Sequence, residues 1–263
     1  MKAKILIIVL LSCCAVQAWI YHPAYFDVFD LEDAYIYPSG SAYPGRLAEY
    51  SYDRNNNWVY RTLDNSRDGT GQIPALVTDH TYYPNGHSVK FEVTSSTAAK
   101  DRTEYNHLAN LPFNFNSYTA FAIFVPESVS NPTSWQMMYQ WHQFSPNSPP
   151  MSLDFMPNGN YSVVLRNDDD SYEQVYTAPL PRGQWVKFLF QHKFALDGNG
   201  YVKLWVDDVF KLDYTGTVGW YSEEDDYLIN TKFGIYRAGT NQACTIYFDE
   251  VRVGTQYSEV RIP

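Results

Sequence analysis

Short runs in which apolar and polar residues alternate follow one another along most of this 263-residue chain, separated by clusters of Asn, Asp, Gly and Pro. Successive side chains of a β-strand point to opposite faces, so each run predicts a strand with one buried face. The runs are 87–95, 118–125, 136–142, 151–156, 161–166, 185–194, 201–206, 209–214, 232–237 and 245–253. Aromatic residues, which suit strands, make up 17% of the chain, and no amphipathic helix is evident. The pattern predicts an all-β fold, a two-sheet β-jelly roll of the concanavalin-like sandwich type.

The N-terminus has a different character. Lys2 and Lys4 precede an apolar run that ends in small residues, which predicts a secretory signal peptide. That run is too short to span a bilayer, and no later segment approaches the roughly 20 apolar residues of a transmembrane helix. We therefore expect a secreted, extracellular protein with no membrane partner. The expected organisation is a signal peptide at 1–18, a Tyr/Pro-rich extension at 19–50 and the β-jelly-roll domain at 51–263.

The charge balance limits the classes of partner. Acidic residues outnumber basic ones by 29 to 19, which leaves a net charge of −10. Binding of nucleic acid requires clustered Lys and Arg, and no such cluster occurs in the sequence, so no nucleic-acid partner is expected. The sequence indicates no particular protein partner either.

Two residues carry expectations about covalent chemistry. Cleavage after Ala18 would leave Cys244 as the one cysteine, which we interpret as a buried structural thiol, with an intermolecular disulfide as the alternative. Asn160 opens an N-glycosylation sequon directly after a Pro-Asn-Gly turn, where it would be exposed.

Two segments place unusual polar pairs on one strand face, because residues two apart on a strand point the same way. Arg102 and Glu104 present a guanidinium and a carboxylate together. Gln140 and His142 present an amide and an imidazole, while Trp141 points to the other face.

A third segment adds a cation and a phenol. Lys232, Gly234 and Tyr236 share a face, while Phe233 and Ile235 point to the core. A glycine between two long polar side chains is expected to leave room for a ligand.

These three segments resemble the signature strands of the jelly-roll polysaccharide lyases. The chain carries R-T-E at 102–104, Q-W-H at 140–142 and K-F-G-I-Y at 232–236, in the family's order. The resemblance is greatest to the branch that contains glucuronan lyases and heparin lyase I. It is more distant to alginate lyases, whose motifs read R-S-E-L, Q-I-H and Y-F-K-A-G-x-Y. It covers roughly residues 89–253 and departs from the alginate-lyase motifs at Tyr105 and Thr231.

The resemblance implies that an acidic polysaccharide is cleaved by β-elimination at a uronic acid. The proton at C5 is weakly acidic, so the neighbouring carboxylate must be neutralised before it can accept electron density. Arg102 and Gln140 suit that task, and Arg102 can bind a carboxylate through two hydrogen bonds. The resemblance implies that His142 or Tyr236 removes the C5 proton and that Tyr236 protonates the leaving oxygen.

The remaining site residues have supporting roles in this interpretation. Lys232, Arg237 and Arg102 are expected to favour the phenolate form of Tyr236 and to bind the substrate. Glu104 is expected to orient Arg102. No metal or other cofactor is required, since protein donors supply the neutralisation. A chain of net charge −10 would repel a polyanion at long range, so an active enzyme needs a locally positive cleft.

Three alternatives remain open. A sandwich glycoside hydrolase would need paired carboxylates, and the E-x-D-x-E pattern that usually supplies them is absent. The acidic runs 168–170 and 223–226 are interpreted as solvated loops, with calcium binding as their functional alternative. The alternative to an enzyme is a secreted extracellular-matrix or biomineral-associated protein that binds acidic polysaccharide through the same fold without cutting it.

Overall fold

The computed structural model of the chain describes residues 27–29, 35–36, 47–52, 58–84, 86–143, 148–167, 171–220 and 228–263. Strand β13 (Trp185–Lys193) illustrates how the alternating sequence becomes structure, because Val186, Phe188, Phe190 and His192 are buried and the residues between them are partly exposed. One face of the strand therefore packs on the core and the other faces outward.

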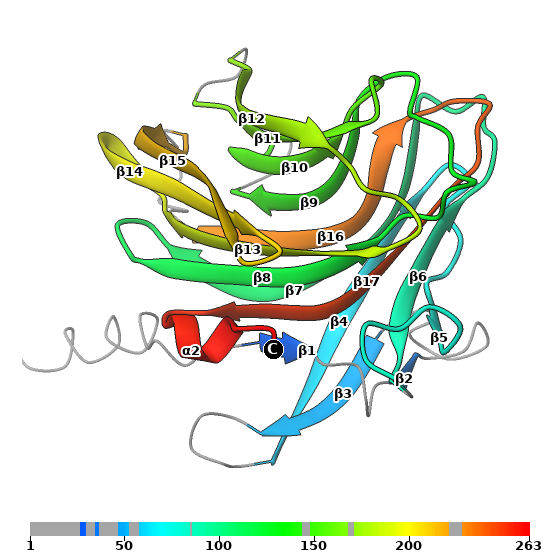
Figure 1. Cartoon of the computed structure of the whole chain (residues 1–263), viewed down its shortest axis with the longest axis horizontal. Coiled ribbons are helices and arrows are strands. Elements are labelled where there is room, and N and C mark those ends of the chain that lie inside the picture. The colour runs from blue at the N-terminus through cyan, green and yellow to red at the C-terminus, as the bar shows by residue number, and fades with distance from the viewer. Residues whose placement is uncertain are drawn as a thin grey trace, which may run out of the picture.

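Two antiparallel sheets stack on each other, and long strands such as β16 and β17 are visibly bent (Figure 1). The first sheet, within the described residues, runs in the order β15-β14-β13-β8-β17-β6-β5, with β1 also paired to β17. Its strands are β1 Asp27–Phe29, β5 Ala75–Val77, β6 Ser88–Val93, β8 Ser117–Phe124, β13 Trp185–Lys193, β14 Ala195–Val206, β15 Val209–Val218 and β17 Cys244–Gly254.

The second sheet runs in the order β12-β11-β10-β9-β16-β7-β4-β3-β2. Its strands are β2 Tyr35–Ile36, β3 Leu47–Tyr52, β4 Trp58–Asp68, β7 Lys100–Pro112, β9 Gln136–His142, β10 Met151–Phe155, β11 Asn160–Leu165, β12 Glu173–Pro179 and β16 Leu228–Ala238. Among the described residues, helix is confined to α2, Tyr257–Val260.

The hydrophobic core lies between the two sheets and is rich in aromatic rings. Phe121 of β8 stacks on Tyr139 of β9 with ring centroids 4.4 Å apart. Phe91 of β6 meets Phe233 of β16 edge to face at 5.7 Å. These pairs join one sheet to the other, so the core fixes how the second sheet is held.

The sequence-based expectation of an all-β, two-sheet jelly roll is confirmed. Each of the ten predicted runs lies in or overlaps a strand, and the run 136–142 coincides with β9. Strands β1 to β5 and β12 were not predicted as strands, and β7 was expected only at 102–104. None of the helices among the described residues is long and apolar enough to cross a membrane.

Most of the N-terminal expectations concern residues outside the described part. The predicted signal peptide at 1–18 lies wholly outside it. Within 19–50, β1 pairs with β17, and β3 runs across residue 50 to pair with β4. These pieces of the predicted extension are therefore paired with strands of the two sheets.

The two residues singled out for covalent chemistry are both described. Cys244 is a free thiol with an exposed fraction of 3%, as predicted for a structural cysteine, and its burial raises the pKa of the thiol. Asn160 is partly exposed at the start of β11, after the turn that Gly159 closes with φ of +84°. Glycosylation of Asn160 stays a prediction.

Candidate active site

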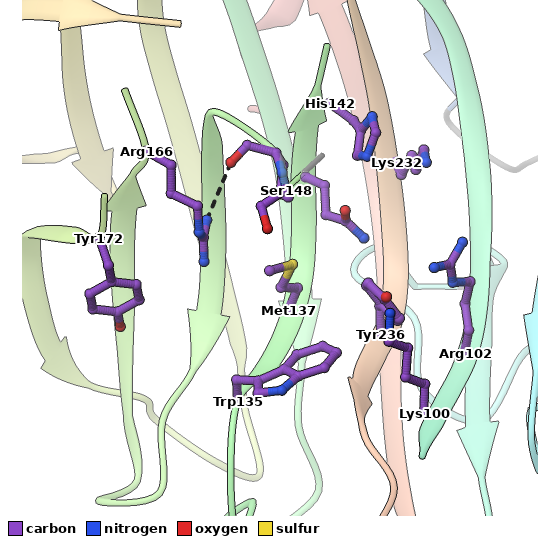
Figure 2. Close-up of a pocket in the computed structure, with 12 residues that line it drawn as sticks. Lys100, Arg102, Trp135, Met137, His142, Ser148, Arg166, Tyr172, Lys232 and Tyr236 are labelled. Atoms are coloured by element: carbon purple, nitrogen blue, oxygen red, sulfur yellow. Dashed lines mark hydrogen bonds between the residues drawn. The ribbon is translucent and has the colours of Figure 1, made fainter. Parts of the chain in front are cut away.

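A cavity of about 600 Å³ opens on the face of the second sheet that points away from the core (Figure 2). Five of the residues that the sequence singled out line it: Arg102, Gln140, His142, Lys232 and Tyr236. They come from three adjacent strands, because β16 pairs with β7 on one side and with β9 on the other.

Strand register brings these side chains together. Lys232 lies opposite Gln140 across the β16–β9 pair, and Tyr236 lies opposite Arg102 across the β16–β7 pair. Directly opposite residues on one face have their Cβ atoms about 5 Å apart. Three segments that are distant in the sequence therefore form one cluster of polar groups.

Tyr236 is held between aromatic and cationic neighbours. The guanidinium carbon of Arg102 lies 4.0 Å from the centroid of the phenol ring, and the Lys100 ammonium lies 5.7 Å from it. The indole of Trp135 meets the ring edge to face, with centroids 5.0 Å apart. Cations over the ring are attracted by its π electrons, so these contacts fix the ring and surround the phenol with positive charge.

Arg102 is positioned by two carboxylates. Its Nε lies 3.3 Å from Oδ2 of Asp68 and 3.6 Å from Oε2 of Glu104. Gln140 donates from Nε2 to Oε1 of Glu104. Glu104 thus lies behind the cavity, in contact with two of the side chains that line it.

The environment of Glu104 shifts its ionisation. Its side chain is fully buried, and this loss of hydration raises its pKa to about 7, while the Arg102 and Lys232 cations and the Gln140 hydrogen bond oppose the rise. Burial also lowers the pKa of Lys232, against the effect of Glu104. The group therefore contains a carboxyl whose charge changes near neutral pH.

Arg237 requires a correction. It was expected to bind substrate, but its exposed fraction is 2% and it does not line the cavity. Its Nη2 lies 3.3 Å from Oδ2 of Asp101 and donates to the carbonyl oxygens of Thr94 and Gln242. Arg237 immediately follows Tyr236 on β16, so its side chain points to the opposite face of the sheet.

The expectation for Gly234 also requires a correction. A Cβ placed on this residue would lie 2.3 Å from the carbonyl oxygen of Thr103 and 3.0 Å from the ring of Phe91, and its φ is +139°. The glycine therefore allows β16 to approach β7 closely and does not provide space for a ligand.

The sequence interpretation missed seven residues that line the cavity: Lys100, Trp135, Met137, Ser148, Pro149, Arg166 and Tyr172. Lys100 could have been found, since it lies two residues before Arg102 and shares its face. Trp135, Arg166 and Tyr172 lie just outside strands β9, β11 and β12, and only the folded structure brings them to the site.

The cavity is positively charged although the chain is acidic. Its lining includes the cations Lys100, Arg102, Arg166 and Lys232, and no Asp or Glu is among the described residues that line it. A locally positive cleft within a chain of net charge −10 is the arrangement that a polyanionic substrate would need.

A family model described as polysaccharide lyase matches residues 53–252. The chain belongs to this family. The polysaccharide lyase match spans both sheets and all the cavity residues named above, and it agrees with the resemblance seen in the three motifs. A search of curated protein sequences finds no match.

Solved structures show the same fold. The endo-β-1,4-glucuronan lyase of the fungus Trichoderma reesei is similar with a TM-score of 0.64 and 17% identity, over 74% of this chain and 92% of that one. Alginate lyase Aly36B gives a TM-score of 0.52 and 10% identity, over 66% and 82%. Alginate lyase vAL-1 from Chlorella virus gives 0.50 and 10%, over 72% and 92%. These likenesses show the fold, and the family match supports the prediction that this polysaccharide lyase is an enzyme, over the binding-only alternative.

Within the described residues, no group of three or more His, Cys, Asp or Glu side chains could hold a metal ion. The acidic runs 168–170 and 223–226, for which calcium binding was the alternative, lie outside the described residues. That no cofactor is required stays a prediction.

Proposed function

We propose that this polysaccharide lyase is secreted and cleaves an acidic, uronic-acid-containing polysaccharide by β-elimination. The observation that carries the proposal is the cavity, which is lined by four cations together with Gln140, His142 and Tyr236. A neutral polysaccharide offers these cations no charged group, whereas a uronate supplies a carboxylate.

The first task of the site is to neutralise the substrate carboxylate. Arg102 and Gln140 donate hydrogen bonds to this carboxylate, and Lys232, opposite Gln140 on the paired strand, adds a third contact. As charge moves from C5 into the carboxylate, these fixed donors stabilise the enolate-like species without having to reorient. Glu104 holds Arg102 and Gln140 in place from behind.

The second task is proton transfer. His142 or Tyr236 removes the proton at C5, the electron pair forms the C4=C5 double bond, and the bond between C4 and the glycosidic oxygen breaks. Tyr236 then gives a proton to the departing oxygen. The Arg102 and Lys100 cations over the Tyr236 ring hold the ring in place beside the cavity during this exchange.

Export of the chain is the second part of the proposal. The positive start and apolar run of residues 1–18 support a signal peptide, and the Asn160 sequon suits a protein that passes through a secretory pathway. Recovery of the chain from the medium, beginning at Trp19, would test this part.

The enzymatic part is tested by the ultraviolet absorbance of the new C4=C5 double bond. We expect it to rise when the mature protein is incubated with one of glucuronan, alginate or heparin. Tyr236→Phe should abolish the rise while polysaccharide binding stays nearly intact. Tyr257→Phe, which changes an exposed tyrosine on α2, is the matched control and should behave like the wild type. No rise with any polyuronate, or full turnover by Tyr236→Phe, would contradict the proposal.

A further inference from the structure

We propose that Arg166 and Tyr172 form a second sugar-binding subsite, at which Arg166 binds the carboxylate of a uronate other than the one that reacts. The proposal rests on the proposed function and extends it from one sugar to a stretch of the polysaccharide. Neither residue belongs to the three motifs, and the two lie at the opposite side of the cavity from Arg102 and Lys100 (Figure 2).

The separation of the two guanidinium groups carries the argument. The guanidinium of Arg166 lies against β10, since its Nη1 donates to the Pro149 carbonyl oxygen at 3.3 Å and to Ser152 Oγ at 3.0 Å. The guanidinium of Arg102 lies against Tyr236 of β16. Strand β9 lies between β10 and β16, so two strand spacings place the groups on the order of 10 Å apart.

One carboxylate cannot satisfy both groups. A charge-assisted hydrogen bond from an arginine spans about 2.8 Å, and the two oxygens of a carboxylate are only about 2 Å apart. An anion bound by Arg102 and Gln140 is therefore out of reach of Arg166. The second cation must meet a different carboxylate, which a polymer of uronates provides on another sugar of the same chain.

Arg166 is prepared to bind an anion. Its exposed fraction is 8%, and its Nη2 lies 3.8 Å from Oδ2 of Asp154, beyond hydrogen-bond distance. Burial of Asp154 raises its pKa to about 6, so this carboxyl is mostly ionised near neutral pH and pairs with the guanidinium at a distance longer than a hydrogen bond. The two hydrogen bonds from Nη1 fix the group, and Nη2 is left to bind a substrate oxygen.

Tyr172 completes the subsite. Its side chain is 53% exposed, it lines the same cavity, and its ring centroid lies 5.5 Å from the guanidinium carbon of Arg166. An exposed ring beside a fixed cation offers an apolar surface for the C–H face of a sugar whose carboxylate meets the cation. Together the two residues recognise a charged sugar, not a bare anion.

The test measures binding, so that it does not depend on turnover. The probes are hexasaccharides of β-1,4-linked glucuronate and of alginate, each beside a copy with its carboxylates reduced to alcohols. The proteins carry Tyr236→Phe, to prevent cleavage, with and without Arg166→Gln. We expect Arg166→Gln to weaken hexauronate binding about tenfold, as for loss of one charge-assisted hydrogen bond, and to leave binding of the reduced copy unchanged. Arg261→Gln, the same change at an exposed site outside the cavity, is the matched control.

Kinetics on the active protein give a second readout. Arg166→Gln should raise KM for the polymer about tenfold and change kcat less than about twofold, because the residue does not contact the reacting sugar. A wild type that binds hexauronate without producing unsaturated product would contradict the proposed lyase function but leave the subsite proposal standing.

A third variant addresses folding. Arg166 is buried, so thermal unfolding is measured for Arg166→Gln, and Tyr172→Ala provides a change at an exposed residue. Tyr172→Ala should weaken hexauronate binding severalfold without lowering the melting temperature. The proposal is overturned if Arg166→Gln and Tyr172→Ala both bind hexauronate like the parent, or if no hexauronate binds the parent. It is also overturned if Arg166→Gln weakens binding of the reduced copy as much as binding of the charged one.

Discussion

At the scale of single residues, Glu104 gives the site a dependence on pH. The fully buried carboxyl has a pKa raised to about 7 and contacts Arg102 and Gln140, the two donors assigned to the substrate carboxylate. When Glu104 is ionised, its carboxylate competes with the substrate carboxylate for these donors. When Glu104 is protonated, this competition is weaker. We therefore expect KM for the acidic polysaccharide to rise as the pH increases through about 7.

Steady-state kinetics from roughly pH 5.5 to pH 8.5, a range that covers both sides of this pKa, would check the prediction. Glu104→Gln keeps the side-chain shape and removes the ionisation, so its KM should be flat across the range. Glu127→Gln, at an exposed residue outside the cavity, serves as the control and should keep the rise. An unchanged rise of KM in Glu104→Gln would assign the titration to another group.

His192 makes a separate prediction, for stability. It is fully buried beside Thr119, whose Oγ1 lies 2.9 Å from its Nε2, and burial lowers its pKa from 6.5 to about 3. As the pH falls below 6.5 the unfolded chain binds a proton at His192 and the folded protein does not, so stability is lost progressively between pH 6.5 and 3. The loss from this residue should reach about 2 kcal/mol at pH 5 relative to pH 7.

Urea unfolding at pH 5 and pH 7 measures this loss. His192→Gln removes the titrating group. It should therefore make the difference in the free energy of unfolding between pH 5 and pH 7 smaller by about 2 kcal/mol. His87→Gln, which changes a partly exposed histidine, is the matched control and should keep the full difference. Equal pH dependence in His192→Gln and the wild type would be incompatible with the prediction.

At the scale of elements, the Arg237–Asp101 pair joins β16 to β7 on the side away from the cavity. The two residues are cross-strand partners and are almost fully buried. Removing only the cation leaves a buried carboxylate without its charge partner, so Arg237→Met should destabilise the protein by about 3–5 kcal/mol. The double variant Asp101→Asn/Arg237→Met should recover much of that loss.

The same variants separate structure from substrate binding. Because Arg237 does not line the cavity, KM of the protein that remains folded at low temperature should stay within about twofold of the wild type. Denaturant unfolding and the absorbance assay supply the two measurements. A large rise of KM without loss of stability would restore the substrate-binding role first expected for Arg237.

The elements also show how much the sequence could predict. Strand β9 is buried over all but its last residue, and its predicted range is the observed one. Strand β12 lies at the edge of its sheet, where few of its side chains are buried, so its composition carries little alternation. The spacing of residues within each strand was enough to predict on which strand face Arg102, Gln140 and Lys232 lie. Arg166 and Trp135 depend on which strands pair, and pairing between distant segments is set by packing of the whole core.

At the scale of the whole molecule, the acidic chain and its positive cavity act on a polyanion over different distances. The net charge of −10 repels the polymer at long range, while the cations of the cavity bind it by direct contact. The screening length falls from about 30 Å at 0.01 M salt to about 8 Å at 0.15 M. Moderate salt therefore weakens the repulsion more than the contacts, and higher salt weakens both.

We expect kcat/KM for an acidic polysaccharide to rise from 0.01 M to roughly 0.15 M salt and to fall at higher concentrations, since screening then reaches the contacts in the cavity. The measurement is the initial rate of absorbance increase at low substrate concentration across a salt series. Neutralising two exposed carboxylates that do not line the cavity, with Asp208→Asn and Asp213→Asn, reduces the long-range repulsion and should make the initial rise shallower. A rate that falls steadily from the lowest salt concentration would mean that attraction by the cavity dominates at every distance, and that the acidic surface has no part in substrate encounter.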